Sequence, residues 1–177
     1  MIFDMGPALL FCPGDRPDRF TKAAERADAV ILDLEDAVGP DAKDAARAAI
    51  EDATLDPART IVRVNAVGEG MLDADLDAAR RAGVTTIMLA KTESARQLDA
   101  LDGFAVVALC ETAAGVVHAV DIAAHPNVVA LMWGAEDLVA GIGGTSSRDE
   151  DGAYRAVARQ ARSHVLLAAA ASGKRAI

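Results

Sequence analysis

Short apolar segments alternate with longer segments rich in alanine and charged residues along almost the whole chain. Neighbouring parallel strands need a crossover of about a dozen or more residues, and the longer segments can supply one as a helix. The alternation therefore predicts a parallel α/β fold. We expect six strands, at residues 8–13, 29–34, 60–65, 85–91, 105–111 and 128–134.

Helix signals fall between the predicted strands. Leu72, Leu76 and Ala79 are at helical spacing and predict a helix over 73–82, which Gly83 is suited to end. No proline-rich or serine-rich linker interrupts the chain, so we expect one domain over residues 1–177. With 52% apolar residues, that domain has enough material for a hydrophobic core.

The charge and cysteine content exclude several classes of protein. The net charge is −9 and lysines and arginines form no cluster, which argues against nucleic-acid and membrane partners. No apolar segment approaches the roughly 20 residues that span a bilayer. Cys12 and Cys110 stand singly in apolar segments, which indicates reduced thiols in the core rather than a disulfide or a zinc site. We therefore expect a soluble, cytoplasmic protein.

Polar side chains gather where the predicted strands end. Because side chains alternate between the faces of a strand, Asp33 and Glu35 share one side of the second strand, and Arg63 and Asn65 share one side of the third. The carboxyl ends of parallel strands form the edge at which ligands bind in α/β folds. The position of Arg63 in an otherwise valine-rich strand indicates a functional role for its charge.

Two carboxylates suggest a metal site at the same edge. Glu111 follows the fifth predicted strand, and if the sixth continues to residue 137, Trp133, Ala135 and Asp137 share one of its sides. Adjacent strand ends lie about 5 Å apart, so Glu111 and Asp137 could share one hard cation. The alternative is that both carboxylates only cap the helices that follow.

Six segments, in order, resemble one known family. They are LFCPGDRPDRF at 10–20, VILDLEDAV at 30–38, RVN at 63–65, MLAKTES at 88–94, ETAAG at 111–115 and GAEDL at 134–138. Together they are similar to the citrate lyase beta-subunit-like (CitE-like) family of the HpcH/HpaI aldolase superfamily. The resemblance runs from about residue 9 to the end of the chain. It implies a TIM (β/α)8 barrel of the phosphoenolpyruvate/pyruvate type, usually a homotrimer.

The resemblance also implies an activity and its residues. Members of this family make or break carbon–carbon bonds in acyl-CoA or acyl-carrier thioesters with Mg²⁺. By this resemblance, Glu111 and Asp137 bind Mg²⁺, Arg63 holds the substrate carboxylate, and Ala135 lies with them in the substrate-binding site. Citramalyl-CoA, malyl-CoA or a citryl thioester would then be cleaved into acetyl-CoA, or another acetyl thioester, and a 2-keto acid. Oxygen ligands suit Mg²⁺, and the planar fork of an arginine suits a carboxylate.

Four further charged residues each have two possible roles. Glu35 either anchors Arg63 or takes part in proton transfer, and anchoring is favoured because a guanidinium needs its donors satisfied. Lys91 is expected in an ion pair rather than as a Schiff-base nucleophile. Arg16 and Arg19 flank the predicted start of the first helix and are candidates for binding the CoA phosphates, with ordinary surface capping as the alternative.

The substrate and reaction stay open at this level. A Mg²⁺-dependent aldolase acting on free 2-keto-3-deoxy acids without CoA is one alternative, and a non-catalytic lyase subunit is another. The sequence does not fix the acyl half of the substrate, the direction of the reaction, or whether hydrolysis follows cleavage.

The end of the chain departs most from the family. After the sixth strand, a long helix is expected over 152–171, and residues 173–177 look like the opening of a seventh strand. A (β/α)8 barrel needs two more βα units and typically about 250 residues. We therefore expect that strands seven and eight are missing and that these residues belong to a longer polypeptide. The missing part would include the family's proton-transferring aspartate, so we expect the chain alone to be inactive.

Overall fold

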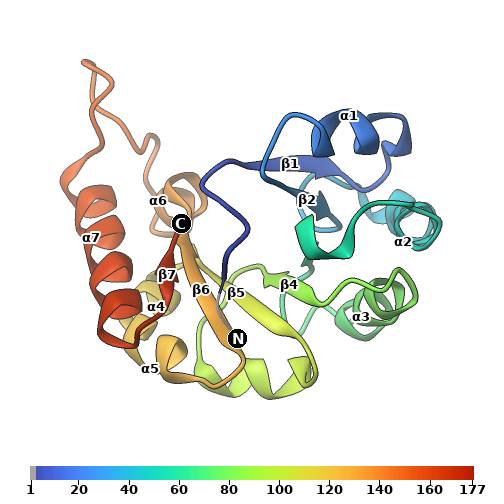
Figure 1. Ribbon diagram of the computed structural model, residues 1–177. Coiled ribbons are helices and arrows are strands. Elements are labelled where there is room, and N and C mark those ends of the chain that lie inside the picture. The colour runs from blue at the N-terminus through green and yellow to red at the C-terminus, as the bar shows by residue number, and fades with distance from the viewer. Residues whose placement is uncertain (1–2) are drawn as a thin grey trace. The chain divides into compact units, whose positions relative to one another are not determined.

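The computed structural model describes residues 3–177, which form a parallel α/β fold (Figure 1). Contacts divide the chain into two compact units. The N-terminal unit comprises Asp4–Ala90 and Gly103–Ala105, and the C-terminal unit comprises Phe3, Lys91–Asp102 and Val106–Ile177. Each unit has its own parallel strands and its own helices.

The N-terminal unit contains four parallel strands in sequential order. They are β1 (Leu9–Pro13), β2 (Ala29–Asp33), β3 (Thr60–Val64) and β4 (Thr86–Leu89). Every residue of β2 and β3 is buried, which is why these strands read as nearly continuous apolar segments. In their register Asp33 pairs with Arg63.

Helices connect these strands. They are α1 (Phe20–Ala24), α2 (Lys43–Glu51) and α3 (Leu72–Arg81), with short 3-10 helices at Pro17–Arg19, Pro40–Ala42 and Pro57–Arg59. In Figure 1, α2 and α3 pack side by side. Gly83 follows α3 with a φ of +71°, a conformation that favours glycine and that ends the helix where the sequence predicts.

The C-terminal unit is built on three parallel strands. They are β5 (Ala105–Cys110), which belongs to this unit from Val106 on, β6 (Val128–Trp133) and β7 (Arg175–Ala176). A 3-10 helix spans Ala95–Leu101, and the α-helices are α4 (Ala113–Val117), α5 (Ala119–Ala124), α6 (Ala135–Gly141) and α7 (Ala156–Ala171). Figure 1 shows α7 alongside α4 and α5, and a row of alanines on α7 allows close packing against β6.

All six predicted strands are present, with ends within two residues of the expected ones. The expectation that residues 173–177 open a seventh strand is confirmed, because Arg175 and Ala176 pair with β6 and the amide of Ile177 donates to the carbonyl of Leu131. Two expectations need correction. Strand seven is therefore not wholly missing. The sixth strand stops at Trp133, and the residues that were expected to continue it form α6 instead. Within residues 3–177, no helix is both long and apolar enough to span a membrane.

Candidate functional site

In the N-terminal unit, Arg63 is held by two buried carboxylates. Its Nε and NH2 donate to Oδ1 and Oδ2 of Asp33 at 2.7 and 2.6 Å, which is a parallel bidentate pair. Its NH1 lies 3.0 Å from Oε2 of Glu35. Arg63 is 9% exposed and the two acids are 1% and 3% exposed, so water screens these interactions little.

The strand register explains this arrangement. Asp33 ends β2 beside Arg63 on β3, so both side chains leave neighbouring strands at the same level. The ring of Phe11, on β1, lies 5.0 Å from the Arg63 guanidinium carbon and adds a cation–π contact. The guanidinium is therefore fixed in its plane by acids and on one face by an aromatic ring.

Asp33 also orders the chain that follows it. Its Oδ1 accepts the amide of Glu35 at 2.9 Å, and its Oδ2 accepts the amide of Ala37 at 3.2 Å. With the two bonds from Arg63, four donors therefore surround this carboxylate. The expected contact between Glu35 and Arg63 is present, but Asp33 makes the tighter pair. Sequence reasoning gave Asp33 no role, although it shares a strand face with Glu35.

Asn65 directly follows β3 and lies away from solvent. It is 1% exposed, and its side-chain amide donates to the carbonyl of Leu34 at 3.0 Å and to Oδ2 of Asp75 at 2.7 Å. Its Oδ1 accepts from Nζ of Lys43 at 2.8 Å. Asn65 therefore connects Lys43 and Asp75 to the backbone of Leu34, the residue before Glu35. The sequence did not reveal Lys43 and Asp75 as its charged partners.

In the C-terminal unit, Glu111 follows β5 directly and is 2% exposed. Its Oε1 accepts the backbone amide of Lys91 at 3.0 Å. Lys91 has a φ of +48°, which is uncommon for a residue with a side chain. This left-handed conformation accompanies the backbone contact that orients the Glu111 carboxylate.

Gly134 leaves the space that Glu111 occupies. Cys110 pairs with Trp133 in the register of β5 and β6, so the next residues, Glu111 and Gly134, are neighbours. A Cβ at position 134 would lie 2.9 Å from both Cβ and Oε2 of Glu111, closer than real Cβ contacts come. A side chain at position 134 would therefore displace the carboxylate.

Asp137 lies in the first turn of α6, two residues after Ala135. The expectation that Ala135 and Asp137 alternate along a strand is therefore wrong, because the chain turns into a helix at Gly134. Asp137 is half-buried, and its carboxylate makes no hydrogen bond or ion pair within residues 3–177. Ala135 is 8% exposed and opens the helix.

The alternative reading of the two acids as helix caps does not hold. Thr112 caps α4, since its Oγ1 accepts the amide of Gly115 at 3.0 Å, and Gly134 is the N-cap of α6. Glu111 precedes the first cap and Asp137 follows the second. Both carboxylates therefore remain candidates for a ligand.

The donor set fits Mg²⁺ better than zinc. Within the described residues, no three His, Cys, Asp or Glu side chains lie close enough together to hold a metal ion. Structural and catalytic zinc sites use three or four protein ligands of this kind. Mg²⁺ is usually held by one or two carboxylates, with water and substrate completing its shell. Glu111 and Asp137 are suited to that role.

Arg16 and Arg19 lie on the surface at the start of α1. Nε and NH2 of Arg16 donate to the Asp18 carboxylate at 3.2 and 3.3 Å. This hydrogen bond lowers the pKa of Asp18 and raises that of Arg16. The geometry matches ordinary surface pairing for Arg16, and a role of both arginines in CoA binding stays a prediction.

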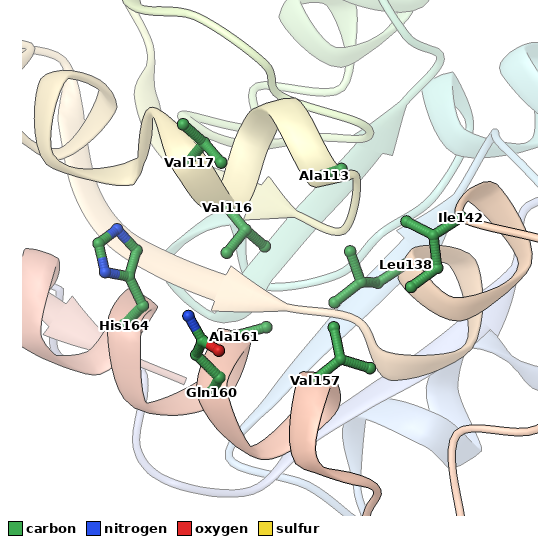
Figure 2. A pocket seen from close by; sticks show the side chains of 9 residues that line it. All are labelled: Ala113, Val116, Val117, Leu138, Ile142, Val157, Gln160, Ala161 and His164. Carbon is green, nitrogen blue, oxygen red and sulfur yellow. The ribbon is translucent and has the colours of Figure 1, made fainter. Parts of the chain in front are cut away.

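A groove of about 340 Å³ lies between α4, α6 and α7 (Figure 2). Nine residues line it: Ala113, Val116, Val117, Leu138, Ile142, Val157, Gln160, Ala161 and His164. Figure 2 shows mostly apolar side chains facing one another across it. It contains none of the predicted site residues, so its lining gives no support for carboxylate or metal chemistry.

Comparison with known proteins gives three kinds of match. The model of the HpcH/HpaI aldolase/citrate lyase family matches residues 8–177. The citrate lyase subunit beta-like protein of Mycobacterium tuberculosis strain H37Rv is 56% identical over 172 residues, which are 97% of this chain and 63% of that protein. The L-malyl-CoA/beta-methylmalyl-CoA lyase of Cereibacter sphaeroides (strain ATCC 17029 / ATH 2.4.9) is 37% identical over 166 residues, with 77% of this chain and 52% of that protein covered.

A solved structure also matches closely. The crystal structure of CitE from Mycobacterium tuberculosis in complex with magnesium, acetoacetate and coenzyme A has a TM-score of 0.94 and 55% sequence identity. The match covers 97% of this chain and 65% of that one. The chain therefore spans between about half and two-thirds of the length of these relatives.

Proposed function

Because the chain belongs to the HpcH/HpaI aldolase/citrate lyase family, we propose that it acts as a Mg²⁺-dependent carbon–carbon lyase on a 3-hydroxyacyl thioester. Citramalyl-CoA, malyl-CoA and a citryl thioester are the substrates that we propose. Cleavage yields acetyl-CoA, or another acetyl thioester, and a 2-keto acid. A lyase for malyl-CoA thioesters among the relatives, and a similar structure that holds magnesium, acetoacetate and coenzyme A, support this assignment.

One observation supports the proposal most directly. The buried carboxylate of Glu111 accepts the backbone amide of Lys91, and Gly134, which has no side chain, leaves the space that this carboxylate occupies. A buried acid that is fixed in this way, beside the N-cap of the helix that bears Asp137, is suited to a hard cation. Bound Mg²⁺ would act there as a Lewis acid on the oxygens of the keto-acid half.

In this proposal Arg63 binds the substrate carboxylate. Asp33 binds the side of the Arg63 guanidinium formed by Nε and NH2, and Glu35 contacts NH1. NH1 and NH2 each carry two hydrogens, so the end of the guanidinium is the part that would meet a carboxylate. Glu35 serves to anchor Arg63, as its position against NH1 favours, and proton transfer by Glu35 is the alternative role.

The finer structural assignments are part of the same proposal. We infer a (β/α)8 barrel of the phosphoenolpyruvate/pyruvate type, a single domain and a homotrimer. Parallel strands in sequential order that alternate with helices support the barrel. Cys12 and Cys110 are both buried and free, which fits a reducing cytoplasm.

The test is acetyl-CoA release by the protein at its natural length. Malyl-CoA, citramalyl-CoA and citryl thioesters are supplied in turn, with Mg²⁺ and then with a chelator. We expect at least one substrate to be cleaved only with Mg²⁺, and Asp137→Asn to remove that activity. Cleavage of free 2-keto-3-deoxy acids alone would indicate an aldolase that works without CoA. Mg²⁺ binding without cleavage of any substrate would indicate a non-catalytic subunit.

A further inference from the structure

We propose that Lys43 is a positioning residue that fixes Glu35, and through Glu35 the Arg63 guanidinium, by binding the backbone of the segment after β2. The proposal rests on the proposed function, in which Arg63 binds the substrate. Lys43 does not touch that substrate in this proposal. It acts from behind, through carbonyl groups of the protein.

The ammonium group of Lys43 has three hydrogens, and three acceptor oxygens surround it. Lys43 opens α2 and is 7% exposed. Its Nζ donates to the carbonyl of Leu34 at 2.5 Å, to the carbonyl of Glu35 at 2.8 Å and to Oδ1 of Asn65 at 2.8 Å. All its donors are therefore used, and two of them bind consecutive peptide groups of the segment that carries Glu35.

The same segment is bound on its amide side by an opposite charge. The Asp33 carboxylate accepts the amides of Glu35 and Ala37, while Lys43 binds the carbonyls of Leu34 and Glu35. The backbone of Glu35 is thus held at both its N–H and its C=O. Its side chain starts from a fixed point and reaches NH1 of Arg63 at 3.0 Å.

Neighbouring charges hold the lysine network in turn. Asn65 donates to the carbonyl of Leu34 and to Asp75, which is fully buried. Nε of Arg47, on α2, donates to Oδ1 of Asp75 at 2.7 Å. One chain of hydrogen bonds therefore runs from Lys43 through Asn65 and Asp75 to Arg47. The negative charge of Asp75 compensates part of the positive charge of the two cations.

Stability alone is a poor reason for this arrangement. Replacing buried ionic groups by apolar residues of similar volume is often neutral or stabilising, because removing charge from water is unfavourable. An apolar residue at position 43 would pack α2 without fixing the carbonyls of Leu34 and Glu35. The lysine, unlike an apolar residue, fixes the position of the backbone at Leu34 and Glu35.

Lys43→Met tests the proposal, because methionine keeps much of the length and loses every donor. Ile50→Ala is the matched control, since Ile50 is a fully buried residue of the same helix that bonds neither carbonyl. Amide hydrogen exchange is measured in both variants and compared at matched global stability. We expect exchange at Glu35 and Ala37 to rise about tenfold or more in Lys43→Met only.

Kinetics supply the second readout, in the protein at its natural length. We expect kcat/KM for the thioester to fall about tenfold in Lys43→Met, with Mg²⁺ affinity unchanged, and to fall less in Lys43→Arg, which keeps the charge. If Lys43→Met does not fold, Lys43→Gln against Ile50→Ala carries both comparisons, because the uncharged glutamine is shorter than lysine and has two N–H donors in place of three.

Three outcomes separate the possibilities. Equal exchange at Glu35 and Ala37 in Lys43→Met and in the control would overturn the proposal, because Lys43 would not hold the segment. Faster exchange with unchanged kcat/KM would also overturn it, because the held position would not matter to catalysis. A wild-type protein that cleaves no thioester overturns the proposed function instead, while the exchange comparison still decides whether Lys43 fixes Glu35.

Discussion

Gly134 lies so close to Glu111 that a Cβ at position 134 would stand 2.9 Å from the Glu111 Oε2. The φ of Gly134 is −124°, which any residue adopts, so the glycine is needed for space and not for backbone freedom. The position of the Glu111 carboxylate, which we propose as a Mg²⁺ ligand, therefore depends on the absence of a side chain at position 134.

The first prediction is that Gly134→Ala weakens Mg²⁺ binding about tenfold or more, because the added methyl group displaces the carboxylate that a hard cation needs. Isothermal titration of Mg²⁺ measures the effect. Gly141→Ala is the control, since a Cβ at position 141, also on α6, meets nothing within 4 Å. Equal Mg²⁺ affinity in the two variants would remove Gly134 from the metal site.

The second prediction concerns Arg63→Lys. Lysine keeps the charge but loses the bidentate pair with Asp33 and the contact between NH1 and Glu35. We expect kcat/KM to fall about tenfold or more, with Mg²⁺ affinity retained. Arg80→Lys is the control, because Arg80 pairs with the exposed Asp77 and contacts the ring of Phe104 but bonds no group of the proposed site. Near-wild-type kinetics with Arg63→Lys would show that this arginine does not bind the substrate.

The strands were predictable because buried parallel strands are continuous apolar segments, whichever face they present. The contact between Glu35 and Arg63 was also predictable, because residues at the same level of neighbouring strands meet. Asp137 was placed on the wrong element because the period of two was extended beyond Trp133. Gly134 is the N-cap of α6, but the sequence around it does not distinguish a strand residue from a helix start.

The role of Lys43 had no sequence signal. A lysine at the first position of a helix usually points into solvent, and two of its three acceptors here are backbone carbonyls. Backbone groups are present at every residue, so no side-chain pattern marks the two that are bound. For the same reason, the contact between the Lys91 amide and Glu111 could not be predicted from residue types.

The third prediction is that no Schiff base forms at Lys91. The metal supplies the electron sink in the proposed reaction, so an imine is not required. Treatment with pyruvate and borohydride, followed by mass spectrometry, should leave Lys91 unmodified. A reduced adduct on the peptide that contains Lys91 would instead indicate a metal-independent aldolase mechanism.

The fourth prediction concerns Cys110 and alkaline pH. Burial, and to a lesser extent the charge of Glu111, raises the pKa of this thiol from 9.0 to about 12. The unfolded chain releases the thiol proton first, so unfolding becomes easier as pH rises from about 9 to about 12, by up to about 1.4 kcal/mol per pH unit from this group. Below pH 9 the thiol contributes no pH dependence.

Urea unfolding at pH 8 and pH 10 measures this loss of stability. Cys110→Ala lacks the thiol, so it should lose less stability between these two pH values than the wild type. An equal loss in both proteins would contradict the assignment to Cys110.

The most direct measurement is isothermal titration of Mg²⁺ into the wild type and into Asp137→Asn. The asparagine keeps the volume of the side chain and removes the charge that a hard cation requires. We predict that the wild type binds Mg²⁺ and that Asp137→Asn nearly abolishes binding without changing the unfolding transition. Unchanged Mg²⁺ affinity in Asp137→Asn, with the fold intact, would contradict a metal site at Glu111 and Asp137.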